Sequence, residues 1–201
     1  KNDKFIVIGS SATLSQEYRI LNADNPDGKF KIFQERVNGL EYSISHFKDK
    51  WYITTNKDGA TNFKLMNCPE NKTNSKNWKE YVPHRDDVLL EGVEVFNDFL
   101  VLTERENGLR RVDIRPWSGK GRHYINFEEE AYSLYSSANP EMNTSKFRYS
   151  YSSMTTPNSV VEYDMISKDM KVLKETEVLG GKFDKNNYQS KRAVSYTHLT
   201  L

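Results

Sequence analysis

The C-terminal residues Asn186–Leu201, NNYQSKRAVSYTHLTL, contain the side chains most suggestive of catalysis, a serine at Ser195 and a histidine at His198. A serine hydrolase needs a hydroxyl nucleophile and an imidazole base that the fold brings into contact. A spacing of three residues does not supply that geometry. The sequence therefore gives no reason to assign either residue a catalytic role.

Motif searches predict no catalytic residue, no metal ligand and no cofactor-binding residue. The sequence has no Gly-x-Ser-x-Gly elbow, no His-Glu-x-x-His, no Cys-x-x-Cys and no Walker lysine motif. The four histidines, His46, His84, His123 and His198, are scattered without a second ligand at metal spacing. The single cysteine, Cys68, cannot form an internal disulfide and is expected to be a small buried hydrophobe.

Three acidic features of the sequence could in principle form sites. Glu128–Glu130 and Asp86–Asp87 fall in connections between apolar runs and are expected to form a solvated face. Glu91, followed by Gly92 at the start of a strand pattern, has two interpretations. It either points into a central channel, where it would bind a cationic substrate, or caps a turn, and we favour the cap.

Bulk composition excludes several classes of function. The 29 basic and 28 acidic side chains nearly cancel, which argues against a nucleic-acid partner that needs a basic stripe. No apolar run is long enough for a membrane helix, so no membrane partner is expected. The 12 tyrosines and 10 phenylalanines favour half-buried strands joined by polar turns.

An internal repeat organises the chain. Four similar runs begin at Phe5, Trp51, Phe99 and Phe147, with spacings of 46, 48 and 48 residues. A period of about 40–50 residues with several strands per unit is typical of a β-propeller. We therefore predict an all-β fold, a partial β-propeller of about four four-stranded antiparallel blades, over residues 1–185.

Each repeat divides into short strand patterns. Turn dipeptides stand between the second and third strands at Asp58-Gly59, Asn107-Gly108 and Pro157-Asn158. The first blade lacks its opening strand, so the chain is expected to begin in mid-blade. The predicted strands are 4–11, 17–23 and 29–35; 41–47, 50–57, 62–68 and 77–82; 89–96, 98–105, 109–115 and 122–127; and 131–137, 146–153, 159–165 and 170–175.

Two long segments, LLEGVEVFNDFLVLTERENGLRRVDI (89–114) and FRYSYSSMTTPNSVVEYDM (147–165), resemble the oligopeptidase B branch of the prolyl oligopeptidase family of serine peptidases. The similarity runs from about Phe5 to Arg192. The resemblance implies a seven-bladed propeller over an α/β-hydrolase domain with a Ser-Asp-His triad. It also implies hydrolysis of short peptides after Arg or Lys.

The same resemblance assigns Tyr188–Arg192 to the junction that leads to the catalytic domain, and we place this junction at residues 186–193. Every member of the family's triad follows that point, so no catalytic residue is transferred to this chain. The chain alone is expected to be inactive.

The implied role of the propeller is to exclude folded proteins from the active site, with short peptides and the hydrolase domain as its partners. The expected location is cytoplasmic, with the periplasm as the alternative. Two other functions stay open: a non-enzymatic β-propeller that acts as a protein-interaction module, and another branch of the same family with a different substrate preference.

The octapeptide Val194–Leu201 has a different interpretation. Its sequence is identical to the translation of GTC TCT TAT ACA CAT CTG ACG CTG, which is a transposase mosaic end joined to a sequencing adapter. We therefore predict that residues 194–201 derive from an adapter and that Ser195 and His198 have no part in a mechanism.

Overall fold

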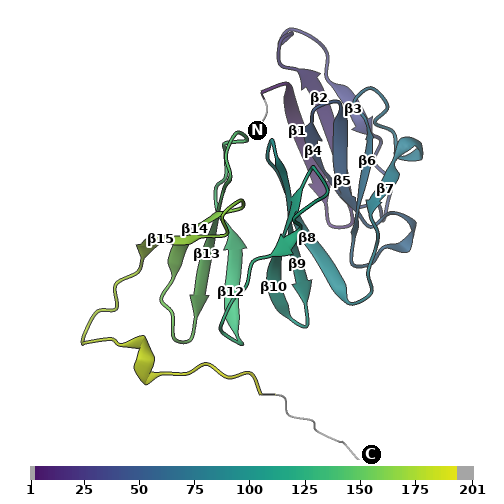
Figure 1. Cartoon of the computed structure of the whole chain (residues 1–201). Coiled ribbons are helices and arrows are strands. Elements are labelled where there is room, and N and C mark those ends of the chain that lie inside the picture. The colour runs from purple at the N-terminus through teal and green to yellow at the C-terminus, as the bar shows by residue number, and fades with distance from the viewer. Residues whose placement is uncertain (1–2, 194–201) are drawn as a thin grey trace, which may run out of the picture. The chain divides into compact units, whose positions relative to one another are not determined.

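The computed structural model describes residues 3–193, whose regular secondary structure consists of β-strands and three short 3-10 helices (Figure 1). Ser195, His198 and the rest of the predicted adapter-derived tail, 194–201, lie outside the described residues. The described part of the chain has no helix long and apolar enough to cross a membrane. The chain forms two compact units, one of residues 3–123 with 140–144 and one of 124–139 with 145–193.

The first sheet has three antiparallel strands in the order β1-β2-β3. They are β1 (Phe5–Ala12), β2 (Ser15–Asn22) and β3 (Lys31–Gln34). This confirms a first blade with one strand fewer than the others. Strand β1 lies at the edge of the sheet, and its Ile6, Val7 and Ile8 side chains are exposed.

The second sheet has the order β4-β5-β6-β7. Its strands are β4 (Tyr42–Phe47), β5 (Lys50–Thr55), β6 (Lys64–Pro69) and β7 (Lys79–Val82). The 3-10 helices η1 (Lys57–Gly59) and η2 (Ser75–Asn77) occupy its loops. Asp58 and Gly59 both adopt positive φ, so the predicted Asp-Gly turn is confirmed as a left-handed corner between β5 and β6.

The third sheet pairs β8 (Val88–Val95), β9 (Phe99–Glu106), β10 (Leu109–Pro116) and β11 (His123–Tyr124) in the order β11-β10-β9-β8. Asn107 and Gly108 are the two loop residues of the β9–β10 hairpin, with φ of 50° and 80°. Positive φ at both positions is the geometry that an Asn-Gly hairpin turn supplies.

The fourth sheet, in the second unit, has the order β12-β13-β14-β15. Its strands are β12 (Tyr132–Ser136), β13 (Lys146–Ser153), β14 (Ser159–Asp164) and β15 (Met170–Glu175). The 3-10 helix η3 (Lys185–Asn187) follows it. The four sheets confirm the predicted all-β partial propeller, with strands inside or within two residues of the predicted segments.

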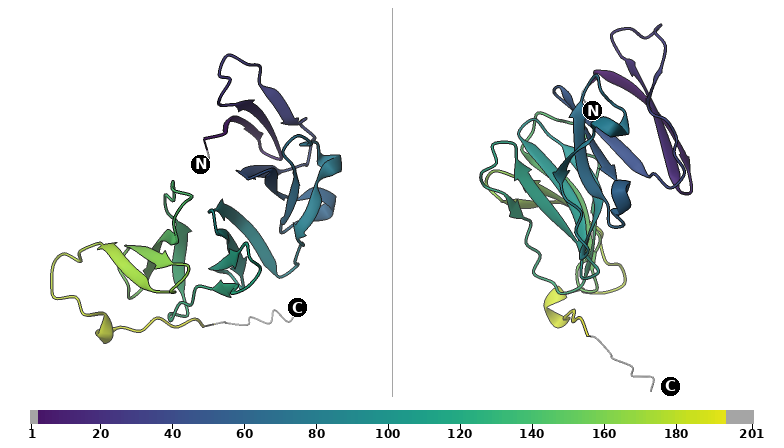
Figure 2. Two further views of the ribbon diagram at one scale, coloured as in Figure 1. Left: turned by 45° about the horizontal axis from the view of Figure 1, so that its top comes forward. Right: turned by 90° about the vertical axis from the view of Figure 1, so that its right-hand side faces the viewer.

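In the first unit the β4–β7 sheet lies between the β1–β3 and β8–β11 sheets (Figure 2). An apolar layer packs against each of its faces. Because both faces of this sheet are covered, its central strands β5 and β6 are buried over most of their length. The layer toward the β1–β3 sheet comprises Ile20, Phe33, Tyr42, Trp51, Ile53, Met66, Cys68 and Trp78. The layer toward the β8–β11 sheet comprises Phe47, Tyr52, Leu65, Val82, Leu90, Val95, Leu100 and Leu102.

Candidate functional site

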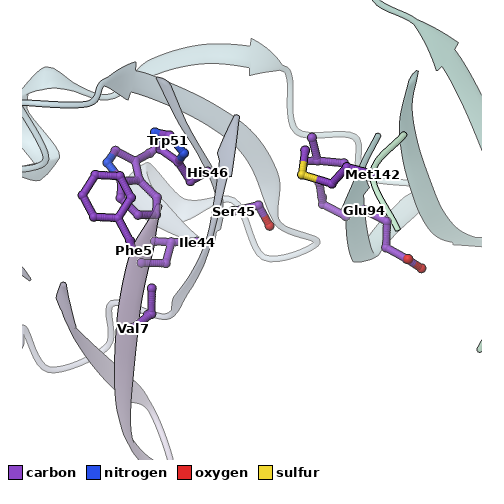
Figure 3. A pocket seen from close by; sticks show the side chains of 10 residues that line it. Phe5, Val7, Ile44, Ser45, His46, Trp51, Glu94 and Met142 are labelled. Carbon is purple, nitrogen blue, oxygen red and sulfur yellow. The ribbon is translucent and has the colours of Figure 1, made fainter. Parts of the chain in front are cut away.

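A hollow of about 190 Å³ in the first unit lies among β1, β4 and β8 (Figure 3). Phe5, His46 and Trp51 form one wall, and Glu94 and Met142 lie on the opposite side of the view. Pockets for small ligands usually enclose about 300–1,000 Å³. This hollow therefore has room for a single side chain and is not a substrate site by itself.

His46, on the wall of this hollow, has the contacts of a packed side chain. Its ring lies 4.9 Å from the ring of Phe5 and 4.7 Å from that of Trp51. Its Nε2 lies 2.8 Å from Oε2 of Glu70, which also accepts from Lys4 at 2.5 Å. Burial lowers the pKa of His46 despite the opposing hydrogen bond to Glu70. We assign His46 a role in packing β1 against β4 and β5.

The other two described histidines fix loops. Nε2 of His84 accepts a hydrogen bond from the backbone N–H of Asn62 at 3.2 Å. Nδ1 of His123 lies 2.9 Å from the carbonyl oxygen of Gly121. Within the described residues no group of three or more His, Cys, Asp or Glu side chains is arranged to hold a metal ion.

Glu91 does not cap a turn, because it is the fourth residue of β8 and its carboxylate binds arginine side chains. The pairing with β9 shifts register between Leu90 and Gly92, which leaves Glu91 as the extra residue of a bulge. Its carboxylate accepts from Nε of Arg105 at 2.7 Å and from Nε of Arg110. Although burial would raise the pKa of Glu91, these hydrogen bonds hold it below its usual value.

Glu129 is the most elaborately bonded carboxylate of the second unit, and the prediction of a solvated acidic face is wrong for it. It accepts from the Tyr151 hydroxyl at 2.7 Å, from Ser153 Oγ at 2.7 Å and from Thr155 Oγ1. Thr156 Oγ1 adds two longer contacts of 3.4 Å. Its neighbours Glu128 and Glu130 are exposed, as predicted.

The electrostatics of this cluster favour a permanent carboxylate. Partial burial would raise the pKa of Glu129, but hydrogen bonds from Ser153, Thr155, Tyr151 and Thr156 outweigh it and lower the pKa. The pKa of Tyr151 is raised, first by burial and then by its hydrogen bond to Glu129. A carboxylate whose lone pairs are already occupied is a poor general base. Glu129 is therefore suited to holding the β13–β14 turn.

Sequence reasoning missed Glu129 because its partners lie 22 to 27 positions further along the chain. The available signal was the density of hydroxyl groups in SYSSMTT, residues 150–156, beside a turn. Several neighbouring hydroxyl groups need hydrogen-bond acceptors for their O–H groups. Nothing in the sequence indicated which of the nearby carboxylates would serve.

Comparison with known proteins adds the family context. Residues 1–176 match the family profile of the prolyl oligopeptidase N-terminal β-propeller domain. Dipeptidyl aminopeptidase BI of Pseudoxanthomonas mexicana is 41% identical over 192 residues, which are 96% of this chain and 26% of that protein. Protease 2 of Moraxella lacunata is 26% identical over 192 residues, 96% of this chain and 27% of that protein.

Solved structures agree with the fold. Oligopeptidase B from Leishmania major superimposes with a TM-score of 0.82 at 28% identity, over 94% of this chain and 28% of that chain. Oligopeptidase B from Trypanosoma brucei with covalently bound antipain superimposes with a TM-score of 0.81 at 28% identity. The match covers 92% of this chain and 27% of that chain. The chain thus spans about a quarter of the length of the relatives that it matches.

Proposed function

This chain belongs to the prolyl oligopeptidase family, and on that premise we propose that it is the substrate-gating propeller portion of a serine-type oligopeptidase that hydrolyses short peptides after Arg or Lys. The likeness to oligopeptidase B over nearly the whole chain carries the proposal. The catalytic serine, aspartate and histidine would belong to a hydrolase domain that follows Arg192.

Gating requires blades that do not deform when a folded protein presses against them. Two features of the first unit support rigidity: aromatic rings link neighbouring sheets, and buried ion pairs link strands and loops of the β8–β11 sheet. Phe33 and Trp51 pack edge to face at 5.2 Å, and the fully buried carboxylates of Glu104 and Asp113 each bind two arginines. A rigid wall rejects bulky substrates sterically, before any pocket selects a side chain.

The test uses the full protein that the gene encodes, compared with residues 1–193 alone. The full protein is expected to prefer N-blocked fluorogenic peptides ending in Arg or Lys over the Ala analogue by at least about 100-fold in kcat/KM. The shorter chain is expected to be inactive. A gene that stops directly after Arg192 would contradict the proposal and favour the interaction module, as would a full protein without peptidase activity.

A matched pair of substrates tests gating itself. One is a free ten-residue peptide containing a single Arg, and the other is the same sequence in the loop of a stable folded protein. We expect cleavage of the free peptide only. Equal cleavage of both substrates would overturn the gating role and leave the peptidase assignment in place.

A second candidate within the family is a dipeptidyl aminopeptidase, favoured by the 41% identity to the Pseudoxanthomonas mexicana protein. The two candidates differ in whether the substrate needs a free amino terminus. Comparing blocked and unblocked forms of one Xaa-Arg substrate separates them. Preference for the unblocked form supports the aminopeptidase, and indifference to the block supports the oligopeptidase.

We also propose a cytoplasmic location for the parent protein, with short peptides and its own hydrolase domain as partners. Fractionation of the source cells tests the location. Recovery with periplasmic marker proteins would contradict it.

A further inference from the structure

The turn between β13 and β14, residues 153–158, is fixed by hydrogen bonds to Glu129 and by hydrogen bonds among its own residues. Glu129 binds Ser153 and Thr155 from outside the turn. Within the turn, Oγ of Ser153 accepts from the backbone N–H groups of Thr155 at 3.0 Å and Thr156 at 2.8 Å. The backbone N–H of Ser153 also donates to the carbonyl oxygen of Thr156 at 2.9 Å. The turn is therefore fixed before any partner binds.

This fixed turn displays one apolar side chain. Met154 is 89% exposed, while Thr155 beside it is buried. The thioether side chain of methionine is flexible and polarizable and adapts to irregular apolar surfaces. A fixed backbone with an adaptable apolar tip loses little conformational entropy when it docks.

The chain itself returns to this end of the sheet. The backbone N–H of Arg192 donates to Oε2 of Glu130 at 3.1 Å, and Glu130 is the neighbour of Glu129 in sequence. In Figure 1 the arrowhead of β13 points toward the yellow C-terminal segment. Whatever follows Arg192 in the parent protein therefore starts close to the β13–β14 turn, at high effective concentration.

We propose that the β13–β14 turn, with Met154 at its tip, is a docking surface for the domain that follows Arg192. Glu129 is its positioning residue, because it fixes the turn through Ser153 and Thr155. This inference rests on the proposed function in one respect, namely that a hydrolase domain follows the propeller.

The experiment places a photo-crosslinking amino acid, p-benzoylphenylalanine, at position 154 of the full protein. The matched control carries the same amino acid at Ile166, which is 71% exposed in the turn at the opposite end of β14. Mass spectrometry is expected to find crosslinks from position 154 to residues beyond 193, and none of these from position 166. The proposal would be overturned if position 154 crosslinked only within the propeller or only to a second copy of the protein. It would also be overturned if crosslinks to residues beyond 193 formed no more often from position 154 than from position 166.

Charge substitutions give an independent readout that needs no crosslinker. Met154→Glu is expected to speed proteolytic cleavage of the 186–193 junction by about tenfold through weaker docking, whereas Met154→Leu and Ile166→Glu leave the rate unchanged. Equal acceleration by Met154→Glu and Ile166→Glu would contradict docking at the turn.

Peptidase activity of the wild-type protein separates the two proposals. An inactive protein with the expected crosslinks overturns the proposed function and retains the docking surface. An active protein without the crosslinks overturns the docking surface alone. A gene that ends directly after Arg192 overturns both.

Discussion

Asp113, in the middle of β10, is a fully buried carboxylate held by two arginines. It accepts from Nε of Arg115 at 2.6 Å and from Nε and Nη2 of Arg122, both at 2.9 Å. The Asp113 side chain is 0% exposed, whereas those of Arg115 and Arg122 are 20% and 49% exposed. The buried member of the network is therefore the acid, and its two partners reach solvent.

This asymmetry predicts which substitution is worse. Arg115→Met with Arg122→Met leaves a buried carboxylate without its partners, at a cost of about 3–5 kcal/mol. Asp113→Asn instead leaves two cations that can turn toward water. We therefore expect a loss of stability of about 1–2 kcal/mol, a value kept low because solvent screens the charge of Arg122. Adding Asp113→Leu to the double arginine variant should restore stability to within about 1 kcal/mol of wild type.

Native-state hydrogen exchange of the full protein measures these losses of stability locally, without assuming that the protein unfolds in two states. At about 1.4 kcal/mol per tenfold change, a loss of 3 kcal/mol accelerates exchange in β9 and β10 by about 150-fold. Asp113→Asn should accelerate exchange in β9 and β10 by roughly 5- to 30-fold. Peptides from β13 and β14, in the other unit, serve as the internal control and should keep their wild-type rates.

Two results would refute this reasoning. One is an Asp113→Asn variant that exchanges as fast as the double arginine variant. The other is a triple variant that exchanges no more slowly than the double. Either would mean that the hydrogen bonds themselves, and not the desolvation of an unpartnered acid, dominate the energetics of the network.

Three further predictions concern other buried groups. Glu129→Ala should cost about 1–3 kcal/mol by removing the shared acceptor of several hydroxyls, with Glu129→Gln closer to wild type, measured as faster exchange in β13 and β14; wild-type rates for both would contradict the role of Glu129. Because burial lowers the pKa of His46 below 6.5 in the folded state, the unfolded state binds more protons. Stability should therefore fall as the pH drops below 6.5, and a His46→Leu variant that keeps this slope would contradict the assignment. Burial raises the pKa of the Cys68 thiol to about 12, so at pH 8 iodoacetamide should alkylate it at least about 100-fold more slowly in the folded than in the unfolded protein, as mass spectrometry would show.

The sheets were predictable because the signal for each strand is local. Trp51, Phe99 and Phe147 lead the second strands of three successive sheets and are all buried, as their recurrence suggested. Asn107-Gly108 determines its own turn through positive φ at two adjacent residues. Such features depend on a few neighbouring residues, and a single sequence records them directly.

The contacts of the acidic residues were not predictable, because they depend on geometry between strands. Glu91 reaches Arg105 and Arg110 only because β8 carries one extra residue where it pairs with β9. A shift of one residue in a strand moves a side chain to the opposite face. The arginine partners of Glu91 therefore depend on a bulge that the sequence pattern does not reveal.

Glu128–Glu130 shows why a run of like charges does not act as one surface. Glu128 is exposed, Glu129 binds the hydroxyls of the β13–β14 turn, and Glu130 accepts from the backbone of Arg192. Adjacent acidic side chains repel one another, and the hydrogen bonds of Glu129 and Glu130 offset that repulsion. Neighbouring acids in one connection thereby hold two distant segments, the β13–β14 turn and the junction. Two neighbouring acids of this loop therefore contact the turn that displays Met154 and the backbone of Arg192.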